Sequence, residues 1–207
     1  MNAPLIAVAD YGIGNLRSAQ KALQKVGADA RLTDDAELIA AADAVVLPGV
    51  GAFGACMNAL RAAKLEQPIL DAAASGRPFL GICVGMQMLF DGSEEDATAV
   101  GLGIIPGTVR WLSDRVKRPQ MQWNRLTTTI ADPMLADLGD EAWMYFVHSL
   151  HGVPTDPAAV VATVDYGGDV NAAFRSGNVF ATQFHPEKSA ASGLRLLGNF
   201  VKEAAGG

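Results

Sequence analysis

The chain has 207 residues, of which 50% are hydrophobic and 18% charged, and its formal net charge is −6. This composition excludes the low hydrophobicity and high charge of disordered proteins, and the length suits one α/β domain over residues 1–207. No run of Lys or Arg offers a positive surface for a phosphate backbone, so we expect no nucleic-acid partner.

The N-terminal residues, the apolar runs and the cysteine count bear on the cellular compartment of the protein. The first residues lack the basic start of a secretion signal, and no apolar run approaches the ~20 residues of a membrane helix. Cys56 and Cys83 could pair, but two cysteines without a signal peptide fit a reducing compartment better. We therefore expect a cytoplasmic protein with at least one cysteine free for chemistry.

Apolar segments alternate with helical patterns along the first half of the chain. Residues 5–9, 44–47 and 79–82 are predicted strands, and residues 15–26, 35–41, 53–63 and 67–74 are predicted helices. Several of these strands are apolar enough to be buried on both faces. This alternation predicts an α/β fold with a mostly parallel central sheet and helices on both faces.

The second half begins differently. From residue 101 to 129 the helical pattern fades, which predicts antiparallel strands or long loops at an insertion or sheet edge. Further strands are predicted over residues 143–147, 160–164 and 179–184. Helical periodicity returns over residues 189–205, which we expect to pack back on the sheet.

The most informative segment carries a candidate nucleophile. Gly81, Cys83 and Gly85 form a G-x-C-x-G pattern where a predicted strand passes into a predicted helix, which is typical of a nucleophile elbow. The dipole of that helix would favour a thiolate at Cys83. Taken alone, the segment fits a buried structural cysteine between packing glycines equally well.

A candidate base and its orienting carboxylate follow the last predicted strand. A thiol nucleophile needs a base, and His185 and Glu187, two positions apart, could face the same side of an extended segment. Pro186 between them would stiffen that geometry. A lone histidine at a strand end is usually a loop or core residue, but Cys83, His185 and Glu187 together make a catalytic triad.

A glycine-rich turn follows the strand at 44–47. Its Gly49, Gly51 and Gly54 fit the G-x-G-x-x-G dinucleotide pattern, but the first strand is the expected carrier of that pattern and no acidic strand end follows ~20 residues later. The turn suits an oxyanion hole instead, with backbone N–H groups of Val50 and Gly51 acting beside that of Val84.

These segments together resemble the class I, triad-type glutamine amidotransferases, and within them the glutaminase subunits of imidazole glycerol phosphate synthase. The class resemblance rests on GICVGMQ, QFHPEKS and PGVGAFG. The narrower one rests on DYGIGNLRS at residues 10–18, on Met86, on MQWN around Trp123 and on YFVHS at residues 145–149. The resemblance covers essentially the whole chain and implies a flavodoxin-like fold with no cofactor and no metal ion.

The resemblance also implies a reaction. Cys83 would attack the side-chain amide of glutamine, His185 would accept the thiol proton and then protonate the leaving ammonia, and Glu187 would orient His185. Water would then hydrolyse the thioester to glutamate. Residues matching the family's glutamine site are Gly51, Gln87, Ser149 and Leu150, with Glu95 at the substrate ammonium, although Glu94 beside it is an equally plausible surface acid.

The implied partner is a (β/α)₈-barrel cyclase subunit, bound as a heterodimer. It would use the ammonia to make imidazole glycerol phosphate and aminoimidazole carboxamide ribonucleotide in histidine biosynthesis. Positions matching the interface are Asn15, Arg17, Trp123 and Lys188. Trp123 would otherwise be an ordinary core residue, and Arg17 part of a solvated helix face.

One stretch departs from the family. Where its members usually read Pro-His-Met-Gly-Trp-Asn, this chain has Gln120 and Gln122 in place of His and Gly, in a region expected to face the partner. Three other interpretations remain: a glutaminase serving pyridoxal phosphate or anthranilate synthesis, a flavodoxin-like redox sensor or chaperone, and a binding module. Of these three, only a glutaminase needs a histidine base and a carboxylate, such as His185 and Glu187, after the last strand.

Overall fold

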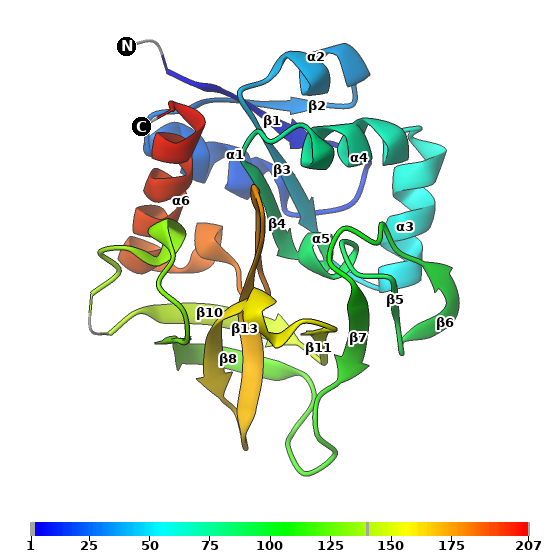
Figure 1. Cartoon of the computed structure of the whole chain (residues 1–207), viewed down its shortest axis with the longest axis vertical. Coiled ribbons are helices and arrows are strands. Elements are labelled where there is room, and N and C mark those ends of the chain that lie inside the picture. The colour runs from blue at the N-terminus through cyan, green and yellow to red at the C-terminus, as the bar shows by residue number, and fades with distance from the viewer. Residues whose placement is uncertain (1–2, 140, 207) are drawn as a thin grey trace.

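An eight-stranded sheet runs through the molecule in the order β2-β1-β3-β4-β14-β13-β12-β9, seen in a computed structural model that describes residues 3–139 and 141–206 (Figure 1). The first five strands are parallel and the last three antiparallel, which confirms the predicted mostly parallel sheet. The parallel strands are β2 (Asp29–Thr33), β1 (Leu5–Ala9), β3 (Ala44–Gly49), β4 (Phe79–Cys83) and β14 (Val179–Thr182); the antiparallel ones are β13 (Asp169–Ser176), β12 (Val160–Asp165) and β9 (Thr127–Thr128).

Helices cover both faces of the parallel strands. Helix α1 (Leu16–Lys25) packs against α6 (Ala190–Ala204), and α2 (Ala36–Ala41) packs against α4 (Glu66–Ala74). In Figure 1, α1 and α6 lie to the left of the parallel strands, and α3 (Phe53–Ala62) and α4 lie to their right. The predicted helices are confirmed, with ends that move by a residue or two.

The strand order places the carboxyl ends of the adjacent parallel strands β1, β3, β4 and β14 at the same edge of the sheet. Helix α1 carries the chain from β1 towards one sheet edge, whereas the connections after β3 lead towards the other. Ligand sites in open α/β sheets form where the strand order reverses in this way. Strands β3, β4 and β14 are buried along their whole length, so groups at their carboxyl ends are supported by the packed core.

The second half builds two smaller sheets. Strand β7 (Gly107–Trp111) pairs with β11 (Leu150–Pro154) and β5 (Gly92–Ser93), which continues to β6 (Asp96–Val100). Strand β8 (Gln120–Arg125) pairs antiparallel with β10 (Trp143–His148). The antiparallel strands expected between residues 101 and 129 are therefore confirmed. The sequence analysis missed β2, β5, β6, β11 and β13. Strand β2 has five residues of mixed polarity, β5 has only two residues, and β11 contains glycine and proline.

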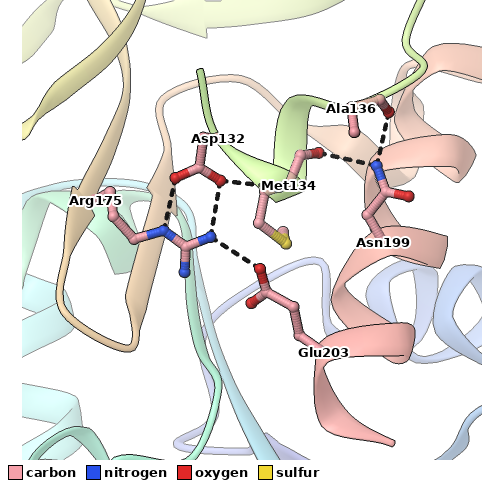
Figure 2. Close-up of polar contacts among 6 residues, drawn as sticks. All are labelled: Asp132, Met134, Ala136, Arg175, Asn199 and Glu203. Atoms are coloured by element: carbon pink, nitrogen blue, oxygen red, sulfur yellow. Dashed lines mark hydrogen bonds and ion pairs between the residues drawn. The ribbon is translucent and has the colours of Figure 1, made fainter. Parts of the chain in front are cut away.

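A polar cluster fixes α6 to the rest of the fold (Figure 2). The Arg175 guanidinium donates to both oxygens of Asp132 at 2.8 Å and to Glu203 of α6 at 3.0 Å. Asn199 of α6 donates to the carbonyls of Met134 and Ala136. Bidentate Arg–carboxylate bonds are among the stronger polar contacts, so the helix that follows the predicted catalytic segment is firmly held. Within the described residues, no helix is long and apolar enough to cross a membrane.

Candidate active site

Cys83 lies at the carboxyl end of β4 in a strained conformation. Its φ of 56° and ψ of −116° are rare for a residue with a side chain. The neighbouring glycine is required by contact, because a Cβ on Gly85 would lie 1.9 Å from the carbonyl oxygen of Leu47. The register places Gly49 beside Cys83, so the glycine-rich turn and the thiol are neighbours. The geometry is that of a nucleophile elbow.

The helix after Cys83 is shorter than expected. Helix α5 spans only Val84–Gln87, because the N–H groups of Leu89 and Phe90 donate to carbonyls three residues back instead of four. The carbonyls of Met88 and Leu89 then accept from a distant segment, from the N–H groups of residues 102, 104 and 105. A single turn sums few peptide dipoles. The short helix α5 therefore gives little support to the expectation that a helix dipole favours a thiolate at Cys83.

His185 and Glu187 meet, although the segment between them is not extended as predicted. Pro186–Lys188 forms a 3₁₀ turn (η3) with Pro186 at its start, where a proline ring suits the helical φ and needs no N–H partner. Within this turn Nδ1 of His185 lies 2.8 Å from Oε1 of Glu187, and both side chains are only 2% exposed. This buried hydrogen bond with the Glu187 carboxylate restricts the orientation of the His185 ring.

Ser189 locks this turn to a neighbouring strand. Its hydroxyl donates to the carbonyl of His185 at 2.6 Å and accepts from the N–H of Tyr145 in β10 at 3.0 Å. The N–H of His185 in turn donates to the carbonyl of Tyr145. The sequence analysis gave Ser189 no role, although it is the last residue of the QFHPEKS motif.

The neighbours of His185 favour the protonated form of its imidazole. Burial lowers its pKa, but the nearby Cys83 sulfur and Glu187 carboxylate favour the charged ring, outweigh burial and raise the pKa to about 9. No described residue is within hydrogen-bond geometry of Nε2, which leaves that nitrogen available to a ligand or to the thiol. A protonated imidazole is the state from which a base returns its proton to a leaving group.

A cavity of about 290 Å³ opens on Cys83 and His185. This volume lies near the lower end of small-molecule sites, ~300–1,000 Å³, and suits a ligand as small as an amino acid. Every residue predicted for the oxyanion hole or for glutamine lies on its wall: Val50, Gly51, Val84, Gln87, Glu95, Ser149 and Leu150. Pro119, Val147 and His148 also line it and were not singled out by the sequence analysis.

Buried amides link the cavity wall to the thiol. The amide nitrogen of Gln87 lies 3.0 Å from Oε1 of Gln183 and 3.3 Å from the carbonyl of Leu150. Nε2 of Gln183 lies 3.9 Å from Sγ of Cys83. Gln87 therefore organises the wall through Gln183 and Leu150, a role that its place in GICVGMQ does not reveal.

Gln120 points inward, contrary to the expectation that this position faces the partner. It is fully buried and its Oε1 lies 2.9 Å from Nε2 of His148, whose Nδ1 lies 2.7 Å from the carbonyl of Leu150. Burial lowers the pKa of His148 to about 4, so the ring is neutral and carries one N–H. Because Nδ1 of the neutral ring donates to the carbonyl, Nε2 can only accept, so we assign the Gln120 amide in the flipped orientation, with its nitrogen donating to Nε2. As placed, that nitrogen has no partner among the described residues, and the flip provides one.

The two neighbouring acids have different positions. Glu95 lines the cavity, and its Oε2 accepts from the N–H of Phe53 at the start of α3. Glu94 lies outside the cavity wall, with a side chain that is 45% exposed and accepts from the N–H of Trp111. Of the two carboxylates, only that of Glu95 can reach a ligand beside Cys83.

The four predicted interface residues divide into two groups. Arg17, Trp123 and Lys188 are exposed, and Trp123, at 44%, is not the core residue that was its alternative interpretation. Asn15 is partly buried, and its side chain reaches Glu187 instead of solvent. Across residues 3–139 and 141–206, no group of three or more His, Cys, Asp or Glu side chains could hold a metal ion.

This combination of an open α/β sheet, an elbow cysteine and a His–Glu pair agrees with the class found by comparison, since the model for "Glutamine amidotransferase class-I" matches residues 7–204. Proteins named "Imidazole glycerol phosphate synthase subunit HisH" are similar over nearly the full length. That of Syntrophotalea carbinolica is 50% identical, over 95% of this chain and 98% of its own. That of Rhodopirellula baltica is 50% identical, over 95% and 97%. The chain therefore belongs to the class-I glutamine amidotransferases, in the group of HisH subunits.

Solved structures agree on the fold. The structure titled PurLQS from Thermotoga maritima superposes with a TM-score of 0.76 at 24% identity, covering 97% of this chain and 98% of that one. A structure titled glutamine amidotransferase gives a TM-score of 0.74 at 20% identity, over 96% and 98%. At these identities the likeness concerns architecture alone, and it supports the flavodoxin-like class.

Proposed function

We propose that this chain is the glutaminase subunit of imidazole glycerol phosphate synthase, and that Cys83, His185 and Glu187 are its catalytic triad. The observation that carries the proposal is the cavity in which the strained Cys83 and the buried His185 face the residues expected to bind glutamine. Near 50% identity over almost the whole chain supports the choice of this subunit over glutaminases with other acceptors.

In the first half-reaction the thiol of Cys83 attacks the side-chain carbonyl carbon of glutamine. His185 takes the thiol proton, and Glu187 holds the imidazole through Nδ1 so that Nε2 faces the sulfur. The tetrahedral oxyanion is met by backbone N–H groups among Val50, Gly51 and Val84. The C–N bond then breaks, His185 protonates the leaving amine, and ammonia departs from a thioester.

In the second half-reaction water attacks the thioester. His185 accepts a proton from the water, the C–S bond breaks, and the proton returns to the sulfur as glutamate leaves. Glu95 and Ser149 are proposed to hold the amino-acid end of glutamine during both steps, since both lie on the cavity wall. The chain's own groups thus supply every proton transfer.

The released ammonia is proposed to pass to a (β/α)₈-barrel cyclase subunit, with the two chains forming a heterodimer in the cytoplasm. Arg17, Trp123 and Lys188 are exposed and available for that contact. There the ammonia would react to form imidazole glycerol phosphate and aminoimidazole carboxamide ribonucleotide, a carbon–nitrogen lyase step of histidine biosynthesis.

Replacement of the nucleophile tests the proposal. We expect Cys83→Ala and Cys83→Ser to abolish glutamine-dependent synthesis by the complex, while synthesis from added ammonium salt survives, because the thiol releases ammonia but does not use it. Both activities are measured on the same partner-bound preparation, with circular dichroism to confirm folding. Equal loss of both activities in a folded, partner-bound variant would refute the assignment.

A further inference from the structure

Asn15 stands immediately before α1 but does not act as a helix cap. Asparagine is among the preferred residues at this position because its side-chain oxygen can accept from a free backbone N–H of the first turn. Here the side chain makes no such bond, and only the backbone carbonyl of Asn15 accepts from the helix, from Ser18 and Ala19. The side chain therefore gives up a stabilising contact, typically about 1 kcal/mol, for another one.

That other contact is with the predicted catalytic carboxylate. Nδ2 of Asn15 lies 3.3 Å from Oε1 of Glu187, across 172 positions of sequence. The same oxygen lies 2.8 Å from Nδ1 of His185. Oε2 of Glu187 is buried and has no hydrogen-bond partner among the described residues. Asn15 and His185 are thus the two polar side chains that orient this carboxylate.

We propose that Asn15 is a positioning residue of the triad, which holds Glu187 so that its Oε1 faces the imidazole of His185. A carboxylate with a single hydrogen bond can rotate about its last torsion, which is broad and soft. The second donor, on a different element, restricts that rotation. The proposal rests on the proposed function, and gives Asn15 a role inside the site instead of only at the partner interface.

Two substitutions separate this role from helix capping. Asn15→Asp keeps a good capping residue and adds a favourable charge at the start of α1, but replaces the donor with a carboxylate that repels Glu187. Asn15→Ala removes the donor and also leaves no side chain that could cap α1. We expect kcat for glutamine hydrolysis to fall roughly 10-fold in Asn15→Ala and further in Asn15→Asp, with KM for glutamine nearly unchanged. A capping role alone predicts that Asn15→Asp retains wild-type kcat, and that result would overturn the proposal.

A double-mutant cycle with Glu187→Gln tests the pair itself. Contacting residues give non-additive effects, so Asn15→Ala should add little to the defect of Glu187→Gln. Asn15→Asp should also do no further harm there, because an amide at position 187 can donate to the new carboxylate. If the fold-losses in kcat of the two single variants multiply in the double variant, the proposal is wrong. All variants are assayed alone and with the cyclase subunit, and a loss seen only with the partner would mean that Asn15 acts solely at the interface.

The outcomes also distinguish this inference from the proposed function. If Glu187→Gln is impaired while both Asn15 variants turn over glutamine normally, the triad stands and the inference is wrong. If Glu187→Gln itself has wild-type kcat, Glu187 is not the orienting residue and both fail. Thermal unfolding midpoints for all variants separate a loss of folded protein from a loss of turnover.

Discussion

At the scale of single residues, the chemistry depends on a few side chains that the fold holds in costly states. Cys83 keeps a positive φ without being glycine, and Glu187 is a buried carboxylate with one oxygen that has no partner in the described part of the chain. Such strain costs of order 1–3 kcal/mol and persists only where the surroundings enforce it. Around Cys83 the enforcing contact is the close approach of Gly85 to the Leu47 carbonyl.

The two partners of Cys83 should differ in importance. In the proposed mechanism His185 transfers protons in both half-reactions, whereas Glu187 only orients it, so we expect Glu187→Gln to lower kcat/KM less than His185→Ala does. Steady-state glutaminase assays on the partnered complex measure both values. The opposite order would mean that Glu187 has a role beyond orienting the imidazole.

At the scale of elements, the junction between η3 and α6 determines whether the triad forms. Gly193 in the first turns of α6 faces the carbonyl of Pro186, and a Cβ there would lie 2.0 Å from that oxygen. Since Pro186 separates the base from its carboxylate, the packing of α6 directly sets the His185–Glu187 geometry. The Arg175 cluster in Figure 2 holds the other end of the same helix.

Two glycines of α6 give a matched test of this junction. Gly193→Ala must push α6 away from Pro186, so we expect a loss of about 1–3 kcal/mol in unfolding free energy and a clear fall in kcat. Gly198→Ala in the same helix meets no atom of the described residues within 4 Å and should stabilise by about 0.5–1 kcal/mol, with kcat unchanged. Urea unfolding measures the change in unfolding free energy, and glutaminase assays measure the change in kcat. Wild-type turnover in Gly193→Ala would contradict the importance of this contact.

In the glycine-rich turn, side chains hold the two carbonyl groups on either side of the Gly49–Val50 peptide. The Tyr11 hydroxyl donates to the carbonyl of Pro48 at 2.6 Å, and Sγ of Cys56 lies 3.3 Å from the carbonyl of Val50. Burial raises the pKa of Tyr11 above its usual value, so this donor persists at any physiological pH. Any reorientation of the turn is thereby focused on the Gly49–Val50 peptide, which carries a predicted oxyanion donor.

At the scale of the whole molecule, this arrangement leads us to expect control by the partner. Glycines at 49 and 51 permit a peptide flip, and one missing oxyanion donor typically costs about 10²–10³ in rate. Glutamate release by the isolated chain should be slow and rise at least ~100-fold with the cyclase subunit and its acceptor nucleotide. The measurement compares the chain alone, with partner, and with partner plus nucleotide. Full turnover by the isolated chain would refute this control and leave the triad intact.

Two buried histidines should shape the pH dependence of stability. His185, with its pKa raised to about 9, contributes stability that is complete below its unfolded pKa of about 6.5 and is lost as pH rises through about 9. His148, with its pKa lowered to about 4, stays neutral while the unfolded chain takes up a proton, so stability falls as pH drops from about 6.5 to about 4. Each effect is of order 3 kcal/mol.

Urea unfolding at about pH 5, 6.5 and 9 tests these signs. We expect His185→Asn to flatten the alkaline decline and His148→Asn to flatten the acid decline, each leaving the other limb in place. An alkaline decline of wild-type size in His185→Asn would show that another group is responsible.

The sequence by itself determined the features that depend on short stretches of chain. Alternating apolar and helical segments predict the parallel sheet because each buried strand must be covered on both faces. The elbow around Cys83 and the His185–Glu187 pair are readable because each is encoded within five residues or fewer. The form of the segment at Pro186 was mistaken, since two-residue spacing suits a 3₁₀ turn as well as a strand.

Only the tertiary structure decided which distant side chains meet. The contacts of Asn15 with Glu187, of Gln87 with Gln183 and of Gln120 with His148 join positions 172, 96 and 28 apart. They arise because the strand order brings β4 beside β14, and because Gln120 falls on the inward side of β8. Side-chain identity restricts which bonds are possible, but the register and packing of the strands select which of them form.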